Sequence, residues 1–114
     1  MTDSYRLDFA RLDDDDQTIS AALTIALKGQ GVAKPWRRPP GSLASIDPAI
    51  QSLIIDILDP ENIKTALELA FLYLMSRKAK RVKVLGIEIE LQDRDPKAAA
   101  EEVVEKSGKK TPKK

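Results

Sequence analysis

Residues 46–75 read IDPAIQSLIIDILDPENIKTALELAFLYLM and hold most of the strongly apolar side chains of the chain. Two Asp-Pro dipeptides, at 47–48 and 59–60, divide this stretch. Asp is a favoured N-cap residue and Pro is favoured at the first helical position, so each dipeptide predicts the start of a helix. We therefore expect two consecutive buried helices, at about 48–58 and 60–78, as the core on which the rest of the chain packs.

The second predicted helix is apolar on more than one side. Its inward face has the i, i+3, i+4 spacing of a helix and consists of Ile63, Ala66, Leu67, Ala70, Phe71 and Leu74. Leu72, Tyr73 and Met75 fall outside that face. A helix that is apolar all round is buried on several sides or meets a partner, so these three residues are candidate partner-binding residues. Membrane contact is not expected, because charged residues interrupt the stretch before it reaches the roughly 20 apolar residues of a span.

The length of 114 residues fits one domain with a single modest core, which we expect over residues 1–108. The tail KKTPKK, at 109–114, has no apolar residue and is expected to be disordered. The chain has no Cys and no His, which removes thiolate ligands and the commonest general base and metal ligand. Nucleophile–base spacings and phosphate-binding Gly loops are also missing. The sequence therefore predicts no catalytic, cofactor-binding or metal-binding residue, and no enzyme.

The first third of the chain predicts a strand followed by a helix. Tyr5, Leu7 and Phe9 alternate with other residues, which indicates a strand over 4–12 with one buried face. The four acids at 13–16 lack the spacing of a calcium loop, and acids are favoured in the first turn of a helix. We therefore expect them to start a helix over about 15–28.

The part after the central stretch predicts a small β-element and a last helix. Apolar residues alternate in 81–85 and again in 87–91, and the phase slips at Gly86. A tight hairpin accounts for the slip, and a single bulged strand is the alternative. A third Asp-Pro dipeptide predicts a short helix over 96–106.

Basic residues gather around the connection at 30–45 and after the second central helix. Trp36, the only Trp, lies among the first group and is a further candidate partner-binding residue, although it is equally suited to covering the edge of the core. The sequence does not decide whether this connection is ordered. The candidate anion-binding residues are Arg37, Arg38, Arg77, Lys78, Lys80 and Arg81. They support an alternative function as a small nucleic-acid-binding protein, but the balance of 19 basic to 18 acidic residues argues against it.

The order of the predicted elements, from the first strand and helix to the hairpin, covers most of the chain, and within it stand the motifs RRPPG (37–41), ALELAFLYLMSRKAKRVKV (66–84) and GIEIEL (86–91). Together they resemble the effector-associated constant component proteins of bacterial conflict systems. This resemblance implies a non-enzymatic partner of an effector or protease module, encoded alongside it, and it supplies no catalytic residues.

These observations predict an α/β fold of the α+β type. It would have a small, mostly antiparallel sheet, made of a strand plus a hairpin, with about four helices on one face. The predicted function is a protein–protein interaction or adaptor module with a protein partner or a second copy of itself. Since the N-terminal residues lack the basic and apolar regions of a signal peptide, the expected location is the cytoplasm.

Overall fold

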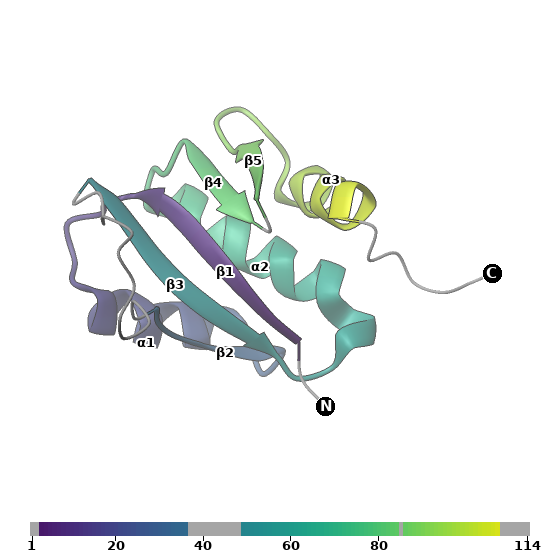
Figure 1. Cartoon of the computed structure of the whole chain (residues 1–114), viewed down its shortest axis with the longest axis horizontal. Coiled ribbons are helices and arrows are strands. Elements are labelled where there is room, and N and C mark those ends of the chain that lie inside the picture. Colours follow the sequence, from purple (N-terminus) through teal and green to yellow (C-terminus); the bar gives the residue numbers. More distant parts are fainter. Residues whose placement is uncertain (1–2, 37–48, 85, 108–114) are drawn as a thin grey trace, which may run out of the picture.

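A computed structural model describes residues 3–36, 49–84 and 86–107 of the chain. The fold of this part is α+β, with one five-stranded antiparallel sheet and three α-helices (Figure 1). The elements in chain order are β1 (Asp3–Ala10), α1 (Asp16–Ala26), β2 (Gly31–Pro35), β3 (Ile50–Ile57), the 3-10 turn η1 (Pro60–Asn62), α2 (Ile63–Ser76), β4 (Arg81–Val84), β5 (Ile87–Glu90) and α3 (Pro96–Ser107).

The strands lie in the order β2-β3-β1-β4-β5, and each neighbouring pair is antiparallel. The first six of these elements, leaving out the 3-10 turn, follow the β-α-β-β-α-β connectivity of the ferredoxin-like motif. β5 then adds a fifth strand beside β4, and α3 follows it. As a result β1, the first strand of the chain, lies at the centre of the sheet (Figure 1).

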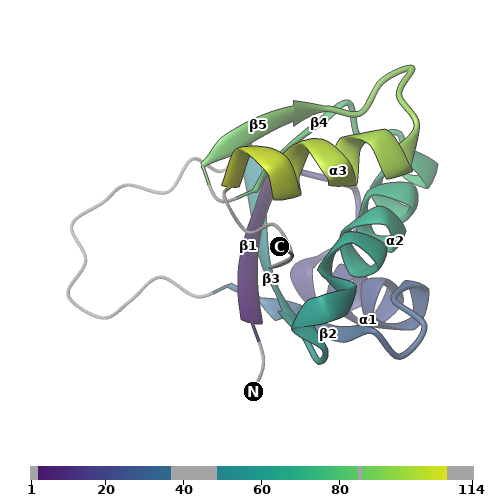
Figure 2. The same ribbon diagram turned by 90° about the vertical axis from the view of Figure 1, so that its right-hand side faces the viewer.

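All three helices lie on one face of the sheet (Figure 2). Alternate strand residues point into the layer between sheet and helices and are buried there, among them Tyr5, Leu7, Phe9, Leu53, Ile55, Ile57, Val82, Val84 and Ile89. The helices contribute Ile19, Leu23, Ile63, Ala66, Leu67, Ala70, Phe71, Leu74, Ala99, Ala100 and Val103 to the same core. This α-over-β arrangement leaves the second face of the sheet without a covering helix among the described residues.

The predicted helix at 48–58 is wrong, because residues Ile50–Ile57 form strand β3. The alternation that identifies a strand is present, with Leu53, Ile55 and Ile57 buried. It was obscured because Ile50 and Ile54 occupy the opposite face, so both faces contain apolar residues. Four Ile residues in this segment favour a strand, since β-branched side chains pack well on a pleated surface.

The other predicted elements are confirmed with small shifts. The first strand, the helix after the four acids, the second central helix and the last helix correspond to β1, α1, α2 and α3. Residues 81–91 form the hairpin rather than one bulged strand, and Gly86 adopts a positive φ of 78° at its turn. The helix count is three rather than about four, and the sheet gains β2 from the segment predicted as a loop.

The four acids after β1 are part of the fold. Asp15 caps α1 by accepting a hydrogen bond from the Thr18 backbone N–H at 2.8 Å, which lowers the pKa of Asp15. Asp14 forms an ion pair with Arg77 at the end of α2. Within the described ranges, no group of three or more acidic residues is arranged to hold a metal ion.

Two sequence predictions fall on residues that the structure does not describe. These are the basic tail at 109–114 and the larger part of the connection at 37–48. Among the described helices, none has the length and hydropathy needed to cross a bilayer.

Candidate functional site

The four candidate partner-binding residues do not form one surface. On α2 only Leu72 is exposed, at 52% of its surface, while Tyr73 and Met75 are partly buried and pack against the core. Burial raises the pKa of Tyr73, and the nearby Asp14 carboxylate adds to this effect while Arg77 opposes it. Trp36 follows β2, a strand on the far side of the core from Leu72's exposed surface. The helix face predicted from the sequence is therefore reduced to a single exposed Leu.

The candidate anion-binding residues are also divided by the structure. Arg77 pairs with Asp14, and Arg81 is shared between Glu88, at 3.8 Å, and Glu90, at 3.1 Å. The charges of these two Arg residues are thus partly neutralised within the chain. Arg37 and Arg38 lie outside the described residues.

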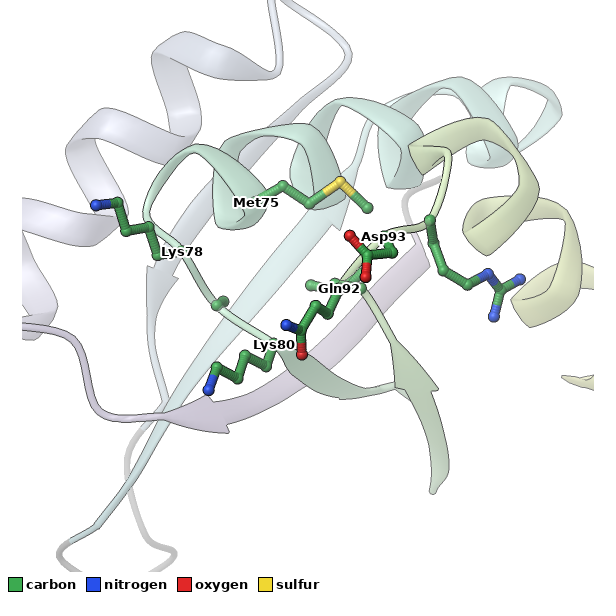
Figure 3. Close-up of a pocket in the computed structure, with 8 residues that line it drawn as sticks. Met75, Lys78, Lys80, Gln92 and Asp93 are labelled. Carbon is green, nitrogen blue, oxygen red and sulfur yellow. The ribbon is translucent and has the colours of Figure 1, made fainter.

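Lys78 and Lys80, in contrast, line a shallow hollow of about 310 Å³ after the end of α2. Its walls also include Met75, Ala79, Leu91, Gln92, Asp93 and Arg94. Figure 3 shows that Met75 points from α2 toward Asp93, whereas the ammonium groups of both Lys residues point away from that pair. Lys78 and Lys80 thus line the same hollow, but their ammonium groups do not point toward a shared binding position.

The remaining charged residues of the hollow disfavour the binding of an anion. Arg94 forms an ion pair with Glu102 at 2.8 Å, and Asp93 adds a carboxylate to the wall. Hydrogen bonds from Lys106 and then Arg94 lower the pKa of Glu102, so this acid remains charged at neutral pH. The C-terminal end of a helix is itself electronegative and attracts cations. Lys78, two residues after the end of α2, is therefore favourably placed for that helix end.

The uncovered face of the sheet carries a more continuous set of side chains, which sequence reasoning missed. The strand registers place them in columns: Val32 and Lys34 on β2, Ile50, Ser52, Ile54 and Asp56 on β3, Ser4, Arg6, Asp8 and Ala10 on β1, Arg81 and Lys83 on β4, and Glu88 and Glu90 on β5. We call this set, together with Trp36 and Leu58 at the strand ends, the open face.

The open face is apolar toward β2 and β3. Val32, Ile50 and Leu58 belong to it and are exposed by 44%, 37% and 50%. They make up three of the five large hydrophobic residues found exposed in the described residues, the others being Ile25 and Leu72 on helices. The β4–β5 side of the face carries only charged residues from these strands. The alternation of Ile50, Ser52, Ile54 and Asp56 was the sequence signal that could have revealed this face.

Polar contacts fix the middle of the open face. The Arg6 guanidinium lies over the Trp36 ring, 4.0 Å from its centroid, in the geometry of a cation–π contact. Arg6 Nε also donates to the Asp8 carboxylate at 2.9 Å, and Ser52 donates to the same carboxylate oxygen. These bonds hold Arg6 and Trp36 in one orientation across β3.

A second cluster lies one position along the same face. Asp56 accepts a hydrogen bond from the Ser4 hydroxyl and pairs with Lys34 at 3.1 Å. The Ser4 bond, with a smaller contribution from Lys34, lowers the pKa of Asp56. The polar residues of these two clusters are thus matched within the chain, whereas Val32, Ile50 and Leu58 are left in contact with solvent.

Comparisons with protein-family models, with curated proteins and with solved structures found no match for this chain.

Proposed function

We propose that this chain is a non-enzymatic protein–protein interaction module that binds its partner with the open face. The observation that carries this proposal is the concentration of exposed apolar residues, Val32, Ile50 and Leu58, on a sheet face that no described element covers. Exposed apolar patches on small domains commonly mark sites of protein contact, and Val32 and Leu58 lie near each other at one end of this face. Trp36, held flat by Arg6, adds the type of aromatic anchor that such sites favour.

The charged residues of the face suit protein contact as well. Those on β1, β2 and β3 are paired within the chain, as in Lys34–Asp56 and Arg6–Asp8, so a partner need not supply a charge to each of these. Protein interfaces combine exposed apolar residues with matched polar groups, as this face does. The resemblance to effector-associated constant component proteins supports the further proposal that the partner belongs to a bacterial conflict system, with the module acting in the cytoplasm.

The alternative as a nucleic-acid-binding protein gains little from this geometry. Sheet domains that bind single-stranded RNA stack bases on aromatic side chains of the sheet. On the open face of the central strands, β1 presents Ser4, Arg6, Asp8 and Ala10, and β3 presents Ile50, Ser52, Ile54 and Asp56. None of these is aromatic, and Trp36, the aromatic residue after β2, already has the Arg6 guanidinium over its ring. A titration of the protein with mixed-sequence RNA at low salt should therefore give no saturable binding.

A pair of double variants tests the proposed surface. In Val32→Lys/Ile54→Glu, the new Lys lies opposite Asp56 and the new Glu lies between Arg6 and Lys34, so the register itself accommodates both charges. The matched control, Ile25→Lys/Leu72→Glu, makes the same two changes at the exposed apolar residues of the helices. Both variants should fold, and circular dichroism with thermal melting checks this.

Association is then measured in two ways. Light scattering over a wide range of protein concentration reports self-association, and affinity capture from a lysate of the source cells, quantified by mass spectrometry, reports other partners. We expect the open-face variant to lose association and the helix-face variant to keep it. Loss in the helix-face variant alone would move the interface to α2 around Leu72. A wild-type protein that stays monomeric and captures nothing beyond what both variants capture would overturn the proposed function.

A further inference from the structure

The two edges of the sheet differ in how their backbone groups are satisfied. At the β2 edge, the register with β3 turns the peptide groups of Gly31, Ala33 and Pro35 away from the sheet. The Thr24 hydroxyl of α1 accepts a hydrogen bond from the Ala33 N–H at 2.9 Å and lies 3.3 Å from the Ala33 carbonyl oxygen. Pro35 has no N–H to offer. The Thr24 hydroxyl of α1 thus occupies the outward backbone groups in the middle of this edge, so a further strand cannot pair there.

The opposite edge, at β5, neighbours α3, but no hydrogen bond from a described helix side chain holds its backbone as Thr24 holds Ala33. The Leu91 N–H donates to the Lys80 carbonyl at 2.8 Å, which sets the alternation of the β4–β5 ladder. By this alternation Ile87 and Ile89 bond to β4, whereas the peptide groups of Glu88 and Glu90 point outward. β5 is the last strand of the sheet, and no described backbone group bonds to these outward groups (Figure 1). They form an unpaired edge two hydrogen-bonding positions long.

The charges of the neighbouring strands define what fits beside this edge. On the open face, Asp8 of β1 lies opposite Lys83 of β4, and Lys83 lies opposite Glu88 of β5. In the next row, Arg81 lies opposite Glu90. The charge therefore changes sign from strand to strand across the sheet. A strand added beside β5 would continue this order if it placed cations opposite Glu88 and Glu90.

A second copy of this chain does not meet that requirement. Two β5 strands paired antiparallel along their free edges would set Glu residues opposite Glu residues on the open face. Like charges directly opposite each other destabilise a strand pair. The chemistry of the edge selects instead a different segment with Lys or Arg at alternate positions. Between the cations it would carry apolar residues, since Ile87, which faces the helix side, is only partly buried.

We propose that the β5 edge binds an extended peptide segment of a partner protein, with basic and apolar residues alternating, which pairs with Glu88 and Glu90 as a sixth strand. Addition of a strand to a free sheet edge is an established mode of peptide recognition, in which main-chain bonds give affinity and alternate side chains give specificity. This inference rests on the proposed interaction function and names the chemistry of the partner segment.

The test uses a fluorescein-labelled peptide of sequence Ser-Lys-Val-Arg-Val-Lys-Ser and its acidic counterpart Ser-Glu-Val-Glu-Val-Glu-Ser. Fluorescence anisotropy measures their binding to the full-length protein at low and at physiological salt. We expect saturable binding of the basic peptide only. The variant Glu88→Gln/Glu90→Gln should bind it about tenfold more weakly, because two opposite-charge cross-strand pairs are lost.

The matched control is Glu61→Gln/Glu105→Gln, which removes the same net charge from exposed positions away from the edge. It should keep wild-type affinity. Amide hydrogen exchange supplies a readout that charge alone does not affect. The outward N–H groups of Glu88 and Glu90 should exchange quickly in the free protein and become protected when the basic peptide binds.

Three results would overturn the inference: no saturable binding of the basic peptide, equal weakening in the two Gln variants, or binding without protection of the Glu88 and Glu90 amides. Any of these could occur while the open-face variant still loses association. In that case the edge would be excluded as a binding site and the proposed interaction function would stand. If the open-face variant also behaves like the wild type, both proposals fail together.

Discussion

The side-chain amide of Gln51, in β3, donates a hydrogen bond to the carboxylate of Asp16, at the start of α1, over 2.7 Å. The same amide donates to the Asp14 carbonyl at 3.2 Å, and its oxygen accepts from the Leu12 N–H at 3.0 Å. Gln51 is fully buried and is tied to the connection between β1 and α1 by all three bonds. It therefore fixes the four-acid segment to strand β3.

Replacing Gln51 with Leu should lower the free energy of unfolding by about 2–3 kcal/mol. The new side chain has a similar size, but the Leu12 N–H and the Asp14 carbonyl lose their partner, and a buried polar group without a partner costs about 1–3 kcal/mol. Urea denaturation measures the change. The control Gln17→Leu, at an exposed position of α1, should shift the midpoint little. Equal stability of the two variants would mean that water replaces the lost bonds.

Lys78 follows α2 with a positive φ of 66°, a conformation that is costly for a residue with a Cβ. Lys78→Gly should therefore raise the free energy of unfolding by about 0.5–1 kcal/mol. Lys80→Gly removes the same charge at a nearby position that lacks a positive φ, and it should lower stability slightly because Gly loses more backbone entropy on folding. Thermal melts of the two variants in one buffer give the comparison. A lower melting temperature for Lys78→Gly would show that the Lys78 side chain contributes more than its backbone strain costs.

Leu67 and Leu72 lie on opposite sides of the same helix and provide a matched pair. Leu67 is fully buried, so Leu67→Asp puts an unpaired charge into the core and should unfold the domain. Leu72→Asp makes the same change at a half-exposed position and should leave a cooperative melt. Phe71→Asp, also fully buried, should behave like Leu67→Asp. A soluble Leu67→Asp protein that still melts cooperatively would contradict the assigned core.

The stability of the protein should change with pH only in the acid range and in the strongly basic range. Asp15, Asp56 and Glu102 have pKa values lowered below their ordinary values of 3.8 and 4.5. A lowered pKa means that the folded state favours the charged carboxylate, so its contribution is complete above the ordinary pKa. It is lost as pH falls through the folded-state pKa. The melting temperature should thus fall steadily below about pH 4.5, near the ordinary Glu value.

In the variant Asp56→Asn the melting temperature should fall less steeply at acid pH, because the carboxyl group that titrates is removed. Glu105→Gln, at an exposed position of α3, is the control. Between about pH 6 and 9 the melting temperature should be level, since the chain has no His and no Cys. The raised pKa of Tyr73 adds stability that is complete below its ordinary value of 10.0 and is lost as pH rises through the folded-state value. A transition near neutral pH would contradict this assignment.

The sequence predicted those elements whose pattern is local. The hairpin was found because the phase slip at Gly86 lies between two short alternating runs, and α1 because acids are favoured in the first turn of a helix. The dipeptide at 59–60 correctly marked a helical start, although it begins with the turn η1 before α2. The dipeptide at 47–48 was misleading, because an apolar open face hid the alternation of β3.

The candidate site was harder to predict because it depends on pairing between distant segments. Arg77 and Arg81 are cations in the sequence, but their partners Asp14 and Glu90 are known only once the strands are in register. Trp36 was noted as a candidate, yet its contact with Arg6 requires β2, β3 and β1 to be side by side. A sheet face is assembled from several strands, and no single stretch of sequence contains it.

The central position of β1 also governs when the chain is able to fold. The strand is synthesised first, but Ala10 pairs with Ile50 and Leu7 pairs with Val84. Such long sequence separations make folding slow, because the entropy cost of closing a long loop comes before the stabilising contacts form. On the ribosome, β1 remains without its partner strands, and its apolar face remains uncovered, until β3 and then β4 have emerged. Chaperones that bind extended apolar segments would therefore meet this strand before any other part of the domain.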